Sequence, residues 1–326
     1  MSIPASAKYS IIHEMTQRDD NLLNIVWLCE AAGVSRSGYY HYLDTEELRR
    51  QREERDRLDF VIILEAYKFR GYDKGARGIY MRLLHLNPPE HMNIKKIRRL
   101  MKKYRLFCPI RKANPHKRAA KAIETGSVAP NLLNREFEMH GPRTVLLTDI
   151  TYIINGKAPR CYMSAIIDAC TKELLAWALS DSLEVDFVLD TVNQLVWDHG
   201  VSLSAKTLIH SDQGVHYKSV RFIRLVEDIE LRRSMSRKAN CWDNAPQESF
   251  FGHMKDEIDI SECLSLSEVH RVISDWVDYY NNDRYQWDLA RLSPKEYYIY
   301  LVTGDYPLSI PKAKGEARIG VRYADN

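Results

Sequence analysis

The sequence has no long apolar run, and no stretch of it reaches the roughly 18 uninterrupted apolar residues that a membrane-spanning helix needs. Its N-terminus, MSIPASAKYSIIHEM, lacks the basic and then apolar segments of a secretion signal. Six cysteines are scattered over 326 residues without a CxxC pair, which argues against both a disulfide framework and a zinc ribbon. These absences predict a cytoplasmic protein with no membrane partner and with reduced, mostly buried thiols.

Acidic residues are missing from one basic stretch. Residues 95–121 contain twelve Lys or Arg and no Asp or Glu. The whole chain carries a net charge of only +3, because residues 1–142 hold 26 basic against 17 acidic residues and residues 143–326 hold 21 against 27. A charge run is usually a solvated helix face. The lack of any compensating acid instead favours a surface that binds phosphates.

Residues 21–43 predict two helices joined by a short turn. Apolar residues repeat with helical spacing up to Ala32, Gly33 ends this helix, and Ser35 can cap the next one. A helix-turn-helix has this pattern and places its second helix in the major groove of DNA, although a plain helical hairpin has the same pattern. In a helix-turn-helix, the outward residues expected to contact DNA are Arg36, Ser37 and His41.

A second helical unit with a basic face follows. Residues 45–58 predict a mixed-charge connector helix, and a further helical block ends in MNIKKIRRLMKKYRLF, where Asn93 can act as the cap. Ile97 and Leu100 would face inward on this last helix. The basic residues expected to face DNA are Lys95, Lys96, Arg98, Arg99, Lys102 and Lys103.

After residue 142 the pattern changes to short β-type runs that alternate with helices. The predicted order is β-β-β-α-β-α-β-α-α, an α/β fold with a mixed sheet and helices on its faces, preceded by all-helical DNA-binding units. The stretch before it contains three prolines, two glycines and no clear periodicity, as a linker does. The expected parts are a helix-turn-helix at 1–45, a connector with the second DNA-binding unit at 46–110, a linker at 111–142, the α/β domain at 143–290 and a C-terminal tail at 291–326.

Three acids lie where such a domain would expose them. Asp149 ends the apolar run VLLT, Asp212 follows TLIHS, and Glu248 lies in the first turns of a helix. Sites in open mixed sheets gather where strands end, so these acids can converge. A single acid is more often a cap or a surface residue. Three acids at strand and helix ends of one domain favour a site.

Convergent carboxylates repel one another unless cations lie among them, and oxygen ligands of this kind suit Mg²⁺ or Mn²⁺. Two ions about 3.5–4 Å apart would support an in-line displacement at a phosphodiester without a covalent enzyme intermediate. The helix that carries Glu248 has a predicted N-cap in Asn244, with Gln247 as the partner in a variant of the capping box. Helical spacing puts Lys255 on the same rim as Glu248, where it would hold a substrate phosphate or form a surface ion pair.

The spacing of these residues is similar to a known signature. Asp212 and Glu248 are separated by 35 residues and Lys255 lies seven beyond Glu248, which resembles the D,D(35)E motif of retroviral-type integrases and bacterial transposases. Four segments narrow the resemblance to the insertion-sequence-three family, and to the catalytic protein of its second reading frame. They are LLTDITYI, HSDQGVHY, SMSRKANCWDNAPQESFFGHMKDE and YYNNDRYQWDLARLSPKEYY. LCEAAGVSRSGYYHYL and residues 75–106 also resemble that family, so the resemblance covers nearly the whole chain.

The resemblance implies an RNase H-like integrase core at 143–290, with Asp149, Asp212 and Glu248 as catalytic ligands of two Mg²⁺ or Mn²⁺ ions and Lys255 as a DNA contact. It also implies nicking of double-stranded DNA at the ends of a mobile element, followed by attack of the freed 3′-OH on target DNA. Homo-oligomers on DNA, in the bacterial cytoplasm and nucleoid, are expected. Residues that flank the ligands would support them or contact DNA, although ordinary structural hydrogen bonds are the alternative for each: His210, Gln213 and Asn244.

Two features of related proteins are missing. No heptad zipper precedes residue 60, so a partner or fusion from an upstream frame could supply a helix-turn-helix and a leucine zipper. The His and Cys spacing of the zinc-binding retroviral N-terminus is absent as well. Two alternative functions remain, a related nuclease that only cuts and a non-catalytic DNA-binding regulator. The nuclease has no need for two N-terminal helical units, and the regulator has no use for the three acids.

Overall fold

The computed structural model describes residues 3–72, 74–109, 140–154, 157, 159–236 and 245–309. The chain forms two compact units, Met1–Glu65 and Ala66–Asn326. Among the helices of these described ranges, none is both long enough and apolar enough to cross a membrane.

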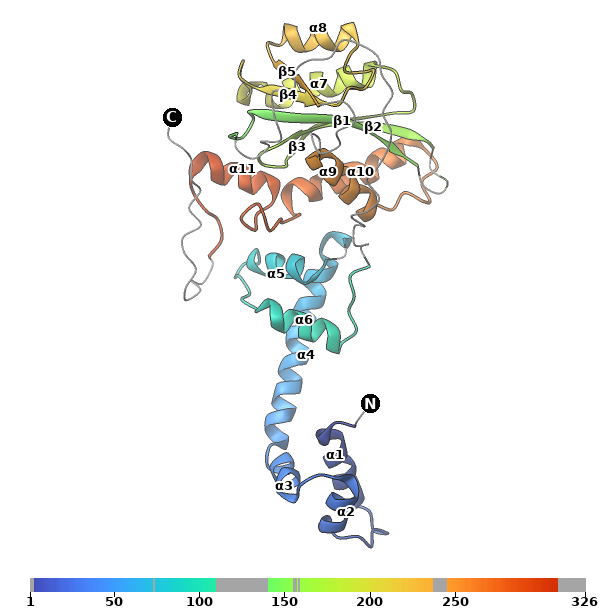
Figure 1. Cartoon of the computed structure of the whole chain (residues 1–326), viewed down its shortest axis with the longest axis vertical. Coiled ribbons are helices and arrows are strands. Elements are labelled where there is room, and N and C mark those ends of the chain that lie inside the picture. The colour runs from blue at the N-terminus through green and yellow to red at the C-terminus, as the bar shows by residue number, and fades with distance from the viewer. Residues whose placement is uncertain are drawn as a thin grey trace. The chain divides into compact units, whose positions relative to one another are not determined.

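The first unit begins with three helices, α1 (Ala5–Thr16), α2 (Ile25–Ala32) and α3 (Arg36–Asp44) (Figure 1). Gly33 has φ 63° and ψ 46° and ends α2, while the Ser35 side chain accepts a hydrogen bond from the Gly38 N–H and begins α3. The predicted sequence of helix, glycine turn and helix is therefore confirmed. The four side chains at the centre of the unit are Ile12, Leu28, Cys29 and Tyr39.

Helix α4 (Glu46–Lys68) is continuous, whereas the sequence suggested a connector helix and a separate helical block. The boundary between the two units falls inside it. A short 3₁₀ turn (Phe69–Gly71) leads to α5 (Ala76–Leu84) and α6 (Ile94–Lys103), which contact each other. The predicted cap and inner face of α6 are confirmed, since the Asn93 side chain accepts from the Lys95 N–H and the buried residues are Ile97, Leu100 and Met101.

A five-stranded mixed sheet forms the centre of the second unit. Its strands are β1 (Val145–Ile153), β2 (Cys161–Asp168), β3 (Leu174–Ser180), β4 (Leu208–Ser211) and β5 (Arg232–Met235). They lie in the order β3-β2-β1-β4-β5. β1, β2 and β3 form an antiparallel meander, and β4 and β5 add to it in parallel.

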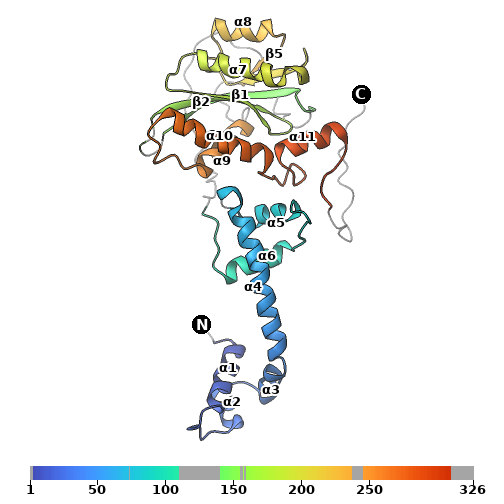
Figure 2. The same cartoon turned by 180° about the vertical axis from the view of Figure 1, so that it is seen from behind.

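Helices cover both faces of this sheet, as both views show (Figures 1 and 2). One face packs on α7 (Asp186–His199) and α8 (Val220–Asp228), with the 3₁₀ turn Gly200–Ser202 after α7. The other packs on α9 (Ala245–Glu257) and α10 (Leu266–Asn282). Alternate residues of β1 belong to the two layers, since Leu147 lies in the α9–α10 core and Leu146 in the α7–α8 core. The predicted α/β fold with its β-β-β-α-β-α-β-α-α order is confirmed.

Neither α1 nor α11 (Pro294–Thr303) was predicted from the sequence. α11 lies within the stretch predicted as a C-terminal tail. Ser293 and Glu296 form a full capping box, and Pro294 occupies the first turn, where a missing N–H does no harm. The segment SPKE indicates this helix N-terminus in the sequence. The finer five-part division of the chain stays a prediction.

Candidate active site

The pairing of β1 with β4 brings two of the three predicted acids together. This parallel ladder ends at Thr148 and Ser211, so the next residues are Asp149 and Asp212. Strand alternation puts Asp149 on the same face as Leu147, toward the layer that contains α9. Asp149 follows the apolar run VLLT but does not end its own strand, because β1 continues to Ile153 against β2. It is the neighbouring strand β4 that ends here.

Helix α9 contacts β1 and carries Glu248 in its first turn. Burial, together with the charges of Asp212 and Glu248, raises the pKa of Asp149 to about 7. The Ile150 N–H, which donates to Asp149 Oδ1 at 2.8 Å, and the charge of Lys255 act in the opposite direction. Asp149 therefore lies within electrostatic reach of all three other predicted site residues.

Lys255 lies on the exposed rim of α9. Desolvation lowers the pKa of its ammonium group, while the negative charge of Asp149 raises it. The apolar stripe predicted for this helix is present, with Phe251 and Met254 buried and Ile258 packed against the same core. This stripe leaves Glu248 and Lys255 beside the sheet, as helical spacing predicts.

A tight turn holds Asp212. The Gly214 N–H donates to Asp212 Oδ1 at 2.7 Å, and a Cβ atom at Gly214 would lie 2.8 Å from the same oxygen. Gly214 is not among the glycines with positive φ. The glycine is therefore needed for this close approach to Asp212 and not for a left-handed backbone conformation.

Tyr217 is buried in the α7–α8 core, close enough to Asp149 and Asp212 for their charges to act on it. Its hydroxyl is 3.4 Å from Thr148 Oγ1, which is itself buried. Burial raises the pKa of Tyr217 well above its usual value, and the charges of Asp149 and Asp212 act in the same direction. The phenol of Tyr217 is therefore neutral.

The predicted flanking residues make structural hydrogen bonds. His210 is completely buried, and its Nδ1 lies 2.9 Å from Ser234 Oγ on the paired residue of β5. Gln213 Nε2 donates to the Ser236 carbonyl at 3.1 Å. Both contacts tie the end of β4 to the end of β5 and so fix the backbone on either side of Asp212. Asn244 lies outside the described residues.

Gln247 was misinterpreted from the sequence. Its side chain is completely buried, and Nε2 donates to the Ala165 carbonyl at 3.4 Å instead of capping the helix. Ala165 is the residue of β2 that pairs with Asp149. Gln247 therefore attaches the first turn of α9 to the sheet beside the site. Gln247 has helical spacing to the buried residues Phe250, Phe251 and Met254. This periodicity is the feature of the sequence that indicates burial of Gln247.

The donor set fits a hard divalent cation, because its members are three carboxylates, and the pKa of Asp149 is raised first by burial and then by the charges of Asp212 and Glu248. Within the described part of the chain, no three side chains of His, Cys, Asp or Glu form a finished metal site. The acids therefore lie in one neighbourhood without forming a closed coordination shell.

The predicted DNA-facing side chains lie at the surface of their own units. On α3, Arg36, Ser37 and His41 are exposed. On α6, Lys96 is half-buried, and the exposed basic residues are Lys95, Arg98, Arg99, Lys102 and Lys103. Both patterns have the outward orientation that DNA contacts require, and the contacts themselves stay predictions.

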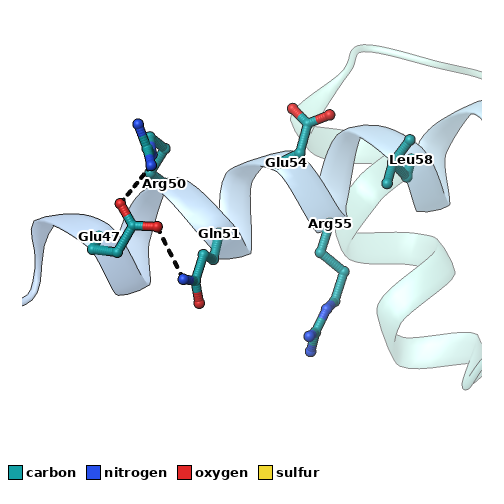
Figure 3. A pocket seen from close by; sticks show the side chains of 6 residues that line it. All are labelled: Glu47, Arg50, Gln51, Glu54, Arg55 and Leu58. Atoms are coloured by element: carbon teal, nitrogen blue, oxygen red, sulfur yellow. Dashed lines mark hydrogen bonds and ion pairs between the residues drawn. The ribbon is translucent and has the colours of Figure 1, made fainter.

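A hollow along one face of α4 belongs to the first unit (Figure 3). Its lining residues are Glu47, Arg50, Gln51, Glu54, Arg55 and Leu58. The Glu47 carboxylate accepts hydrogen bonds from Arg50 and Gln51, and two acids balance two arginines. A neutral, exposed surface of this kind does not fit a phosphate, so the hollow is a solvated helix face.

The mixed sheet and the acids at the end of β4 define an integrase core domain. Two family models, both described as integrase core domain, match residues 139–241 and 229–294. The chain is 33% identical over 176 residues to the InsK protein of insertion sequence element IS150 from Escherichia coli, covering 53% of this chain and 61% of that protein.

Two further relatives are covered almost completely. The 31 kDa protein of insertion element IS600 from Shigella sonnei is 30% identical over 82% of this chain and 96% of its own length. A transposase-like protein of Haemophilus influenzae is 31% identical over 63% of this chain and 93% of its own length. The chain belongs to the family of insertion-sequence transposases with an integrase core domain.

Proposed function

We propose that the chain is the catalytic protein of an insertion sequence of the insertion-sequence-three family, which nicks the ends of its element and joins the freed 3′-OH to target DNA. The ladder of β1 and β4 carries this proposal, because it ends at Thr148 and Ser211 and so sets Asp149 and Asp212 side by side. The chain spans 61% of the IS150 relative, so the activity of the whole protein is part of the proposal.

Asp149, Asp212 and Glu248 would hold two Mg²⁺ or Mn²⁺ ions. Such ions activate the attacking oxygen and stabilise the leaving oxygen of an in-line displacement. Asp149 supplies a carboxylate from the middle of a strand, Asp212 one from the turn that Gly214 closes, and Glu248 one from a helix fixed by Gln247. Each of the three acids is therefore positioned by a different element of the fold.

DNA would be held by the two helical units and by Lys255. The exposed basic face of α6 carries no acid, so it can neutralise several phosphates at once. Arg36, Ser37 and His41 on α3 would read an element end, and Lys255 would position a phosphate at the catalytic site. Homo-oligomers on DNA, an upstream-frame partner and action in the bacterial cytoplasm are further parts of this proposal.

A strand-transfer assay on duplexes from the ends of the element tests the function. We expect wild-type protein in Mg²⁺ or Mn²⁺ to nick these ends and join them to a second duplex, and Ca²⁺ to support binding without turnover, because its larger, looser shell does not fit the reaction geometry. Asp212→Asn should reduce both steps more than about 100-fold, the upper end of what losing a mere supporting residue costs. A protein that cuts the DNA without joining it would be the nuclease of the first alternative. A protein that binds the DNA without cutting it would be the regulator of the second.

The role of α6 is tested by the salt dependence of DNA binding. Replacing Arg98, Arg99, Lys102 and Lys103 with Ala should weaken binding to all sequences alike and lower the slope of log affinity against log salt by roughly 0.9 for each lost phosphate contact. Arg50→Ala with Arg57→Ala is the matched control, since both arginines already pair with Glu47 and Glu54. An unchanged slope in the α6 variant would contradict the proposed phosphate contacts.

A further inference from the structure

The antiparallel strands β1, β2 and β3 extend beyond the end of β4. β1 pairs with β4 only up to Thr148, but it pairs with β2 up to Ile153. The last five residues of β1 therefore have a strand on one side only. Asp149 is the first residue of this extension, so the extension begins at the catalytic site and projects past it.

One face of this extension is buried and the other is open. Thr151 and Ile153 are 8% and 3% exposed and face the α9–α10 layer. Tyr152 and Ile154 alternate with them and are 55% and 63% exposed. The open face thus bears large apolar side chains beside a site that handles a polyanion.

An aromatic pair lies at the centre of the open face. Tyr152 and Tyr162 are directly opposite each other in the ladder, with ring centroids 5.1 Å apart and planes at 73°. Tyr162 is partly packed against the α7–α8 core, which fixes the pair from below. The edge-to-face geometry leaves a face of the Tyr152 ring available to a further flat group.

We propose that Tyr152 stacks on a DNA base that is unpaired next to the scissile phosphate. This inference rests on the proposed function and names a residue that positions the substrate of that same site. Three residues of strand separate Tyr152 from Asp149, about 10 Å at 3.3 Å per residue, and the two side chains leave opposite faces of β1. Because β4 ends at Ser211, the edge of β1 between them is open, and a DNA strand can pass across it from one face to the other. One base step along a DNA strand is about 3.4 Å, so the ring is within reach of the first few nucleotides beside the reacting phosphate.

The charges around the ring favour a base over a phosphate. Tyr162 pairs with Ser180 on its other side, and the exposed Asp181 follows Ser180 directly. An acid there repels phosphates but does not oppose the neutral face of a base. The exposed Arg160, just before β2, can hold the backbone of the same strand at the outer end of the hairpin of β1 and β2. Aromatic platforms beside cations are the usual means of binding unpaired nucleotides.

Removing single bases from the DNA tests this contact. A set of element-end duplexes, each with one abasic nucleotide within three positions of the cleaved bond, is assayed for nicking by wild-type protein and by Tyr152→Ala. We expect one position where the wild type loses roughly 5- to 150-fold and Tyr152→Ala loses nothing further, because the ring and the base are the two halves of one contact. Tyr152→Ala on intact DNA should lose the same factor.

Tyr152→Phe keeps the ring and should behave as the wild type. Trp197→Ala removes an aromatic side chain that is 90% exposed on α7 and should leave the abasic profile of the wild type unchanged. A fluorescent 2-aminopurine at the identified position, bound in Ca²⁺ without turnover, should be quenched by wild-type protein and not by Tyr152→Ala.

The outcomes separate this inference from the function beneath it. Wild-type protein that neither nicks nor joins element ends would overturn the proposed function. An active wild type whose abasic profile is shared by Tyr152→Ala at every position would overturn the stacking contact alone. A change of oligomeric state in Tyr152→Ala on sedimentation, with the wild-type abasic profile retained, would identify the open face as a protein interface and likewise overturn the contact.

Discussion

Clustered carboxylates lie at both ends of the central sheet, but the charged groups around the two clusters differ. At one end, Arg143 Nη1 lies 3.0 Å from Asp168 Oδ2 and Arg143 Nη2 lies 2.7 Å from Glu173 Oε2, with all three side chains at most 8% exposed. At the other end, Asp149 lies near Asp212 and Glu248, and the nearby cation is the exposed Lys255. The first cluster carries its own buried cation, whereas the cation that acts on Asp149 at the second is the exposed Lys255.

This difference separates a structural cluster from a functional one. Asp168 also accepts from the Arg143 and Cys170 N–H groups, so it fastens the turn after β2 to the start of β1. A buried ion pair of this kind is sensitive to loss of either partner, whereas acids that repel one another invite a cation from outside. Asp168 would therefore be a poor control for substitutions at the catalytic acids, although both are aspartates of the same sheet.

The largest expected effect comes from breaking the paired end. Arg143→Met should lower the unfolding free energy of the second unit by about 3–5 kcal/mol, because it leaves the buried carboxylates of Asp168 and Glu173 without their cation. Chemical denaturation of the full chain measures this. Nicking per folded molecule should stay near the wild-type value in conditions where the variant is folded, and an unchanged stability would mean that the cluster contributes little.

Binding of a divalent cation at the catalytic acids should have the next largest effect on stability. Mg²⁺ at about 100 times its dissociation constant should stabilise the second unit by about 2.7 kcal/mol. Folding raises the pKa of Asp149 from 3.8 to about 7, so the folded state binds more protons in this range and the metal-free protein loses stability as pH rises from about 4 to 7. Since the cation needs the ionised acid, thermal melts should show a larger Mg²⁺ effect at pH 8 than at pH 5.5.

Removing one charge from the catalytic acids should stabilise the metal-free protein. Asp149→Asn keeps the shape of the side chain and removes a charge that burial and two other acids oppose. We expect a gain of roughly 1–2 kcal/mol at pH 8, no gain near pH 4, and loss of the Mg²⁺ effect. A destabilised Asp149→Asn at pH 8 would contradict the comparison, since it would show that Asp149 is held by a favourable partner as Asp168 is.

The smallest effect is expected at an acid in neither cluster. Asp190 is exposed on α7. Asp190→Asn should change stability by less than about 0.5 kcal/mol and leave nicking and joining unchanged, as surface substitutions usually do. It is the matched control for the Asp149 and Asp212 variants in the same assays.

Local signals in the sequence predicted most of the secondary structure. Gly33 and Ser35 mark the turn between α2 and α3, and Asn93 marks the start of α6, because caps and left-handed residues satisfy backbone groups within a few residues. The same local reasoning found α9 and its rim. It missed α11, although SPKE is a capping box, and it split α4, whose charged half and apolar half form one helix.

The roles of single buried side chains could not be predicted in this way. Gln247 has the spacing of a capping residue and also that of the buried stripe, and only the contact with Ala165 decides between them. Asp168 and Asp149 are both acids on apolar strands. They differ because Asp168 pairs with Arg143, which is distant from it in the sequence but adjacent to it in the fold. Such choices depend on partners that the chain brings together over long sequence separations.

The sequence by itself determined the order of strands and helices, the basic face of α6, and the acids at residues 149, 212 and 248, because periodicity, caps and charge runs act over a few neighbouring residues. The tertiary structure alone decided that β4 ends at Ser211 while β1 continues to Ile153. That unequal length sets Asp149 beside Asp212 and leaves the face of Tyr152 open. Strand register and strand ends follow from packing the whole sheet between two helical layers, and no local stretch of the chain contains that information.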